Sequence, residues 1–159
     1  MTVRDVVVTR TIDAPVGRVW DAWTQPAEVV RWWGPAGWTS PEAHMDVRAG
    51  ASSHVCMRSP DGVELHNLWT YQQVEPEVRL EFTMEFCDPS GRIVDPADLG
   101  LPPGIPVPVR HVVTLAPGVG ESTELTVTEY GYTSEMTYQM SLAGLEQTLD
   151  KMATSLTGG

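Results

Sequence analysis

Residues 134–156, SEMTYQMSLAGLEQTLDKMATSL, carry a regular apolar pattern. Ser134 is a favourable N-cap for a helix that begins there. Apolar side chains then recur at steps of three and four residues: Leu142, Leu145, Leu149, Met152 and Leu156. This spacing predicts one long amphipathic helix that reaches about Leu156. At a rise of ~1.5 Å per residue the helix would be about 33 Å long, enough to cross a small sheet.

The segments that precede this helix alternate between apolar and polar residues, which is typical of an antiparallel sheet with one solvated face. The clearest example is the set Leu80, Phe82, Met84 and Phe86, which is interleaved with polar residues. We expect strands near 3–12, 42–49, 51–58, 63–75, 78–87, 109–116 and 123–131. The tetrapeptide at 59–62, Ser-Pro-Asp-Gly, predicts a tight turn between two of them.

Two short helices are predicted between the first two strands. Pro15 begins one of them, whose apolar face carries Val16, Val19, Trp20 and Trp23. Pro26 begins the other, which ends at Trp32-Trp33 before a Gly-Pro pair. The order of elements predicts an α+β architecture over residues 1–159 as a single domain. A curved antiparallel sheet of about six to seven strands would wrap around the long C-terminal helix and leave a hollow between them.

Composition excludes several classes of function. The chain has 159 residues, 42% of them hydrophobic, and a formal charge of −11. Such a charge repels nucleic acid and anionic membrane surfaces, so we expect neither as a partner. The N-terminus has no basic segment followed by an apolar one, which predicts a cytoplasmic protein. The two cysteines, Cys56 and Cys87, are accordingly expected to be reduced.

Several motifs in one order resemble a known family. They are IDAP at 12–15, VWDAW at 19–23, WWGP at 32–35, Gly50, Met57-Arg58, Asp61-Gly62, VEP at 74–76, Arg79-Leu80, TELT at 123–126, Gly144 and LDKM at 149–152. The sequence resembles the activator of heat-shock-protein-90 ATPase homologue-like family. That family lies within the START and birch-pollen-allergen-like (SRPBCC) superfamily. The resemblance implies the helix-grip fold and identifies a fold rather than an activity.

Three positions depart from the family pattern. Ala51 stands where a second glycine is usual, Ser53 where an aromatic residue is usual, and Leu145 where tryptophan is usual. If Ser53 and Leu145 face the hollow, these smaller side chains should enlarge it or open it to polar ligands. The long segment 88–108 holds six prolines and is expected to be an irregular loop, a kind of segment that often serves as a lid.

Strand alternation and helix position predict which side chains line the hollow. Mostly apolar residues with a few placed polar groups are typical of ligand pockets. The candidate ligand-binding residues are Trp23, Trp32, Trp33, Ser53, Val55, Met57, Asn67, Trp69, Tyr71, Phe82, Met84, His111, Glu129, Tyr138 and Met140. The ordinary alternative for most of them is a place in the core. Because Trp32 and Trp33 are adjacent, one ring should enter the core or the pocket mouth while the other covers a surface.

His111 and Glu129 are the candidate catalytic residues. Each interrupts an otherwise apolar alternation, on strands that we expect to pair. Glu129 would then orient His111, which would act as an acid or a base near neutral pH. The alternatives are a satisfied structural pair, or a register in which both side chains face water.

Three functions are compatible with these residues. The first is a binding protein for a small apolar or aromatic molecule. The second is an enzyme similar to polyketide cyclases and aromatases, which would fold a reactive chain in the pocket. The third is a chaperone-interaction module, with an exposed apolar patch around Trp33 and Trp38; the missing extra N-terminal domain of the eukaryotic activators argues against it. We expect no cofactor and no metal, because the histidines and cysteines do not show metal-ligand spacing. A homodimer is compatible with the sequence.

Overall fold

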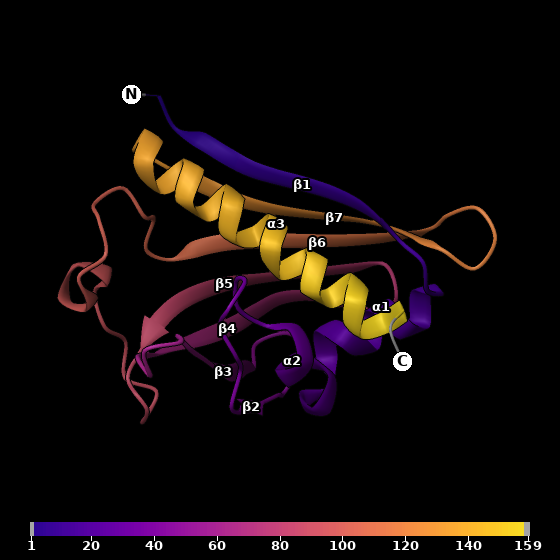
Figure 1. The fold of residues 1–159 in the computed structure, drawn as a ribbon, viewed down its shortest axis with the longest axis horizontal. Coiled ribbons are helices and arrows are strands. Elements are labelled where there is room, and N and C mark those ends of the chain that lie inside the picture. Colours follow the sequence, from indigo (N-terminus) through magenta and orange to yellow (C-terminus); the bar gives the residue numbers. More distant parts are fainter. Residues whose placement is uncertain (1, 158–159) are drawn as a thin grey trace.

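Seven antiparallel strands form one sheet in the order β1-β7-β6-β5-β4-β3-β2 (Figure 1). The computed structural model describes residues 2–157. The strands are β1 Arg4–Ile12, β2 Ala43–His44, β3 Ser52–Arg58, β4 Glu64–Glu75, β5 Arg79–Cys87, β6 Val109–Pro117 and β7 Thr123–Tyr132. From β3 to β7 each strand pairs with the next one along the chain, and β1 closes the order beside β7.

Three α-helices complete the fold. Helices α1 (Val16–Thr24) and α2 (Pro26–Trp32) follow β1, and α3 (Glu135–Thr157) ends the described chain. Pro15 is the N-cap of α1 rather than its first residue, so the helix begins one residue later than predicted, at Val16. Ser134 caps α3 as predicted, because its Oγ accepts a hydrogen bond from the backbone N–H of Thr137 at 3.2 Å.

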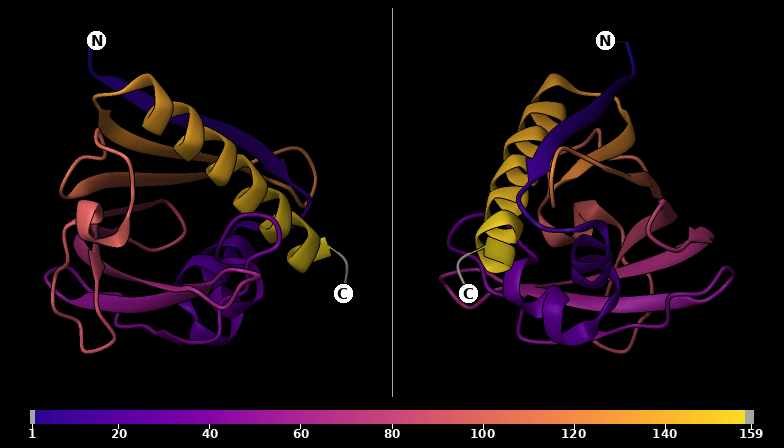
Figure 2. Two further views of the ribbon diagram at one scale, coloured as in Figure 1. Left: turned by 60° about the vertical axis from the view of Figure 1, so that its left-hand side comes forward. Right: turned by 90° about the vertical axis from the view of Figure 1, so that its right-hand side faces the viewer.

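The sheet curves around one face of α3 (Figure 2). The helix packs against β1 and α2, and α1 contacts β6. At its first turn, α3 is joined to the start of β1 by Arg4, which donates to Glu135 at 2.8 Å and lies 3.7 Å from the centre of the Tyr138 ring. The α+β helix-grip prediction is therefore confirmed, with seven strands.

A core of large side chains fills one part of the space between sheet and helices. Trp23, Trp32, Trp69 and Phe82 are almost fully buried there, and Leu149 and Met152 of α3 pack with them. The apolar spacing read along 142–156 therefore marks the side of α3 that faces the sheet. At roughly 1.5–3 kcal/mol for each large side chain buried, these contacts are the main stabilisation of the grip.

Two segments differ from prediction. The strand expected at 42–49 is limited to Ala43–His44, because the chain turns before it rejoins the sheet. The Arg48 N–H donates to the Asp46 carbonyl at 3.1 Å, and Gly50, with φ +85°, already donates to the Tyr71 carbonyl of β4 at 2.8 Å. The irregular segment 88–108 contains one short 3-10 helix, η1 Pro96–Leu99, which Asp95 caps. No helix within residues 2–157 is long and apolar enough to cross a membrane.

Candidate functional site

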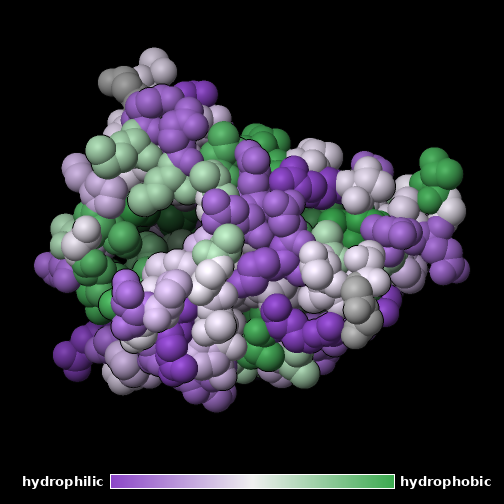
Figure 3. Space-filling view, viewed as in Figure 1, coloured by the Kyte–Doolittle hydropathy of each residue, from purple (hydrophilic) through white to green (hydrophobic). Residues whose placement is uncertain are grey.

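A pocket of about 240 Å³ opens between α3 and the segment 101–105. Its floor is formed by the C-terminal ends of β3 and β5 and the N-terminal end of β4. Figure 3 shows this hollow beside α3, rimmed mainly by hydrophobic residues. Its lining residues are Trp33, Gly34, Pro35, Trp38, Met57, Leu65, Met84, Phe86, Leu101, Ile105, Glu129, Tyr132, Met140, Ser141, Gly144, Leu145 and Thr148. The walls are thus aromatic and aliphatic, with a few hydroxyl groups and one carboxylate.

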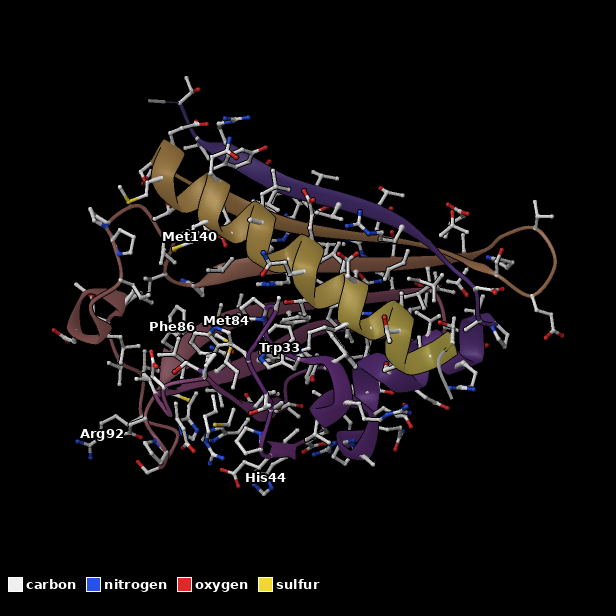
Figure 4. The ribbon with its side chains drawn as sticks, viewed as in Figure 1. Trp33, His44, Met84, Phe86, Arg92 and Met140 are labelled. Atoms are coloured by element: carbon white, nitrogen blue, oxygen red, sulfur yellow. The ribbon has the colours of Figure 1, made fainter. Side chains whose placement is uncertain are left out.

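Separate elements hold the walls in place. Trp33 follows α2, Met84 and Phe86 come from β5, and Met140 projects from the first half of α3, so that the four surround one space (Figure 4). Met140 is 42% exposed and lies at the mouth. The pocket is smaller than the roughly 300–1,000 Å³ of most ligand sites, so it suits a small molecule or one that projects from the mouth.

A larger depression of about 610 Å³ lies on the other flank of α3. It is lined mainly by charged and hydroxyl side chains, among them Arg31, Asp150 and Lys151. Charged and hydroxyl groups of this kind are well solvated, whereas the walls of the pocket beneath α3 are mostly apolar side chains. The pocket beneath α3 is therefore the better candidate site.

Glu129 is the one carboxylate among the described residues that line the pocket. Its Oε2 lies 3.2 Å from His111 Nε2, and its Oε1 accepts a hydrogen bond from the Tyr132 hydroxyl at 2.7 Å. His111 Nδ1 faces the carbonyl oxygen of Val109 at 3.2 Å. Both ring nitrogens of His111 therefore lie within hydrogen-bonding distance of an oxygen acceptor.

The environment sets the acidity of this cluster. Burial by itself would raise the pKa of Glu129, but the attraction and hydrogen bond of His111, with the bond from Tyr132, lower the pKa below its usual value. Burial raises the pKa of Tyr132, and the charge of Glu129 raises it further. Glu129 is thus an anion held by two fixed donors at the wall of an apolar pocket.

The strand alternation explains why this pair forms. Residues 111 and 129 lie directly opposite each other in the β6–β7 register, and both point to the concave face. The His111 ring stacks on Phe82, with ring centres 4.8 Å apart. The prediction that the two residues are neighbours is therefore confirmed, while only Glu129 reaches the pocket wall.

The comparison that identifies the family covers most of the chain. The family model described as "Activator of Hsp90 ATPase homolog 1-like protein" matches residues 13–157. The chain belongs to this family. Domains of the Activator of Hsp90 ATPase homolog 1-like family are helix-grip modules that typically bind ligands.

Solved structures agree with the fold of this Hsp90 ATPase activator-like domain. A protein from Nitrosomonas europaea has a TM-score of 0.77 at 22% identity, covering 97% of this chain and 94% of its own. The AHSA1 protein from Silicibacter pomeroyi has a TM-score of 0.76 at 16% identity, covering 96% and 97%. The AHSA1-like protein from Aeromonas hydrophila has a TM-score of 0.72 at 19% identity, covering 98% and 93%. No curated protein matches the chain significantly.

The predicted pocket residues fall into three groups in the structure. Trp33, Met57, Met84, Glu129 and Met140 line the pocket. Tyr138 lies under the Arg4 guanidinium at the edge of the sheet. The remaining candidates are buried in the core: Trp23, Trp32, Ser53, Val55, Asn67, Trp69, Tyr71, Phe82 and His111. Strand alternation identified the concave face, but it did not separate the packed part of that face from the open part.

The two adjacent tryptophans occupy different environments, as predicted from their neighbouring positions. Trp32 is fully buried and its Nε1 donates to the Ala22 carbonyl at 2.9 Å. Trp33 is partly buried, lines the pocket, and donates from Nε1 to Asn67 Oδ1 at 3.3 Å. Within residues 2–157, Asn67 Nδ2 and the indole nitrogens of Trp23 and Trp69 are buried without an acceptor, so the wall behind Trp33 is rich in free donors.

The departures from the family pattern have different outcomes. Leu145 lines the pocket, so its small size bears on the pocket volume. Ser53 is fully buried away from the pocket, and its Oγ lies 2.7 Å from the Tyr71 hydroxyl and accepts from the Asp46 N–H at 3.0 Å. Ser53 thus packs against Tyr71 in the core, so the small side chain at this position does not enlarge the pocket.

A continuous row of rings runs behind the pocket. Trp33 contacts Trp69 with ring centres 4.9 Å apart, Trp69 stacks on Phe82 at 4.7 Å, and Phe82 stacks on His111. The row begins at a pocket-lining ring and ends at the partner of Glu129. These ring contacts stabilise the packing of the back wall.

Sequence reasoning missed several lining residues. Trp38, Leu101 and Ile105 lie in irregular segments whose position no periodicity gives. Phe86 was placed on the correct face but not selected, and Tyr132 lies one residue beyond the predicted end of its strand. An apolar residue inside a proline-rich loop, such as Ile105, is the one available signal that such a segment folds over a pocket.

Proposed function

We propose that this protein binds a small apolar or aromatic molecule in the pocket beneath α3, with a polar group of the ligand turned toward Glu129. The observation that carries the proposal is the combination of apolar walls with one anchored carboxylate. An apolar body would be buried against Trp33, Met84 and Leu145. A hydroxyl or amine donor would bond to a carboxylate oxygen that still has a free lone pair.

Two features favour binding over the other functions. Each oxygen of Glu129 already accepts a bond from a fixed protein donor, and His111 is 3% exposed behind it, so this pair is better suited to anchoring than to exchanging protons with a substrate. Trp33 and Trp38 are partly buried and line the pocket, so they do not supply the exposed patch that chaperone docking requires.

The test is calorimetric titration with 1-naphthol, an aromatic molecule that carries one hydroxyl donor. Wild-type protein should bind it. The Leu145→Trp variant should lose at least about tenfold in affinity, a change of about 1.4 kcal/mol, because the indole would occupy the pocket. Glu146→Trp is the matched control: it places the same ring one residue away on the exposed side of α3, and it should bind like wild type.

Circular dichroism of each variant shows whether a loss of binding is caused by unfolding. Binding that is equal in wild type and Leu145→Trp, with both folded, would contradict the pocket as the site. Absence of binding to wild type would contradict the proposed aromatic ligand class.

A further inference from the structure

The convex face of the sheet carries a second cluster of reactive side chains. Cys56, His66 and Cys87 occupy one row across β3, β4 and β5, since Cys56 pairs with His66 and His66 pairs with Cys87. All three are 5% exposed or less. They alternate with Val55 and Asn67, which point to the concave side, so this row faces away from the pocket. His44 also lies on this side, at the edge of the sheet far from Met140 (Figure 4).

Cys56 and His66, together with the neighbouring Glu64, bring one possible ligand atom each to a common point. His66 Nε2 lies 3.8 Å from Cys56 Sγ and 3.4 Å from Glu64 Oε1. The sulfur, the nitrogen and the carboxylate oxygen all lie within 4.8 Å of one another. Glu64 is held by Arg58, whose Nε donates to Oε2 at 3.0 Å and leaves Oε1 free to face His66.

One of the two tautomers of His66 leaves a free lone pair on Nε2. His66 Nδ1 lies 2.9 Å from His54 Nε2, so one of these nitrogens donates to the other. When His66 Nδ1 is the donor, its Nε2 carries the lone pair that points at Cys56 and Glu64. A second group that holds the non-ligating nitrogen of a histidine in this way is the common arrangement around bound metal ions.

We propose that Cys56, Glu64 and His66 bind a divalent transition-metal ion, with Zn²⁺ as the best match. Sulfur, imidazole and carboxylate ligands together suit Zn²⁺ and its analogue Co²⁺ better than Mg²⁺ or Ca²⁺, which take oxygen ligands. This proposal concerns the opposite face of the sheet and is independent of the ligand pocket.

Two of the three separations between the ligand atoms fit this ion. With bonds of about 2.3 Å to sulfur and about 2.0–2.1 Å to nitrogen and oxygen, tetrahedral geometry requires an N···S separation of about 3.6 Å and an N···O separation of about 3.4 Å. The N···S and N···O distances here are 3.8 and 3.4 Å. Three protein ligands leave a fourth position, and the exposed Glu64 marks the side from which an ion and a water molecule would enter.

The charge balance is also favourable. A bound thiolate and the Glu64 carboxylate would together neutralise a divalent ion, while Arg58 remains on the outer oxygen of Glu64. Glu42 lies close enough to act electrostatically on Cys56 and adds negative charge. His54 supports His66 without contacting the ion, which makes it a positioning residue.

The test is titration of the reduced, chelator-treated full chain with Co²⁺, followed by its near-ultraviolet thiolate charge-transfer absorption and by competition with Zn²⁺. Wild type should show this band at a stoichiometry of one ion per chain. Cys56→Ser and His66→Ala should abolish it. Glu64→Gln should weaken binding, and His54→Ala should weaken it about 10- to 100-fold while keeping the band.

Cys87→Ser is the matched control, because its sulfur faces His54 at 3.9 Å and lies outside the three-residue group. It should bind Co²⁺ like wild type. Loss of the band in Cys87→Ser with retention in Cys56→Ser would overturn the assignment, and so would the absence of a band in wild type. Circular dichroism confirms folding, and Glu64→Gln, altered at an exposed side chain, provides the readout if Cys56→Ser or His66→Ala does not fold.

Discussion

Two polar clusters lie on opposite faces of the same sheet. They differ in how completely their polar atoms are hydrogen-bonded to one another. On the concave face Glu129 accepts from Tyr132 and pairs with His111, whose other nitrogen faces the Val109 carbonyl. On the convex face His66 stands 3.8 Å from the Cys56 sulfur and 3.4 Å from the Glu64 oxygen. The first cluster is closed by short hydrogen bonds, whereas the second is spaced for an additional atom.

This difference separates two roles for buried polar groups. A cluster whose donors and acceptors are all matched stabilises one arrangement of the strands and presents a fixed charge to the pocket. A cluster with lone pairs aimed at one point contributes little by itself but gains when an ion completes it. Removing a member should therefore be costly on the concave face, and adding an ion should be favourable on the convex face.

The largest effect is expected from Glu129→Ala. It leaves the buried His111 and the Tyr132 hydroxyl without their acceptor, so the free energy of unfolding should fall by about 3–5 kcal/mol in urea denaturation. Glu64→Ala is the counterpart on the convex face and should cost less than about 1 kcal/mol, because Glu64 is solvent-exposed. Equal losses in the two variants would remove the distinction between the clusters.

The next effect is stabilisation by added Zn²⁺. At a free concentration 100 times its Kd, the ion should add about 2.7 kcal/mol to the stability of wild type, which raises Tm by roughly 5–11 °C for a chain of this size. Glu129→Gln should retain the shift, and Cys56→Ser should lose it. Differential scanning calorimetry measures both, and a shift that persists in Cys56→Ser would assign the effect to another site.

Tyr132→Phe should have a smaller effect than Glu129→Ala. It removes one hydrogen bond to the buried carboxylate while His111 still holds the other oxygen, so the expected loss is about 1.5–2 kcal/mol. Tyr130→Phe is the control, since the Tyr130 ring lies beneath Arg110 at the sheet surface and should change stability by less than about 0.5 kcal/mol. Chemical denaturation of both variants decides whether the Tyr132 hydroxyl matters.

The smallest effect concerns pH. The pKa of Glu129 is below its ordinary value of 4.5 in the folded chain, so on acidification the unfolded chain takes up the proton first. This carboxylate therefore stabilises the fold above about pH 4.5, and the stabilisation is lost as the pH falls toward the folded pKa. In that window the stability of wild type should fall more steeply than that of Glu129→Gln, by at most about 1.4 kcal/mol per pH unit. Parallel curves would contradict the lowered pKa.

The sequence predicts the closed cluster much better than the open one. His111 and Glu129 each break an apolar alternation, and β6 and β7 pair without a shift between 110 and 130. A strand has a side-chain period of two, so the break in the pattern and the pairing together place both residues inside. Their contact follows from local alternation and one correct strand pair.

The cluster on the convex face depends on the register between β3 and β4, which the sequence predicts only to within one residue. The turn predicted at 59–62 would place Cys56 opposite Leu65. In the structure the loop extends to Val63, whose N–H donates to Ser59 Oγ at 3.0 Å, and Cys56 pairs with His66. A shift of one residue moves a side chain to the other face, so the predicted turn does not bring His66 opposite Cys56.

Strand alternation alone also does not predict which residues line the pocket. Alternation gave the concave face, but whether a position such as Trp69 is packed or Met84 is open depends on how α3 and the segment 101–105 cover the sheet. That coverage is a long-range property. It is set by the bend of the sheet and by loops that carry no periodic pattern.

The four neighbouring indoles Trp23, Trp32, Trp33 and Trp69 also give the molecule an optical property. Indoles in contact exchange excitation energy, so light absorbed by Trp23, Trp32 or Trp69 can be emitted from Trp33 at the pocket wall. A molecule that settles against that single ring would alter the emission of the whole group, and the unlabelled protein would report its own occupancy.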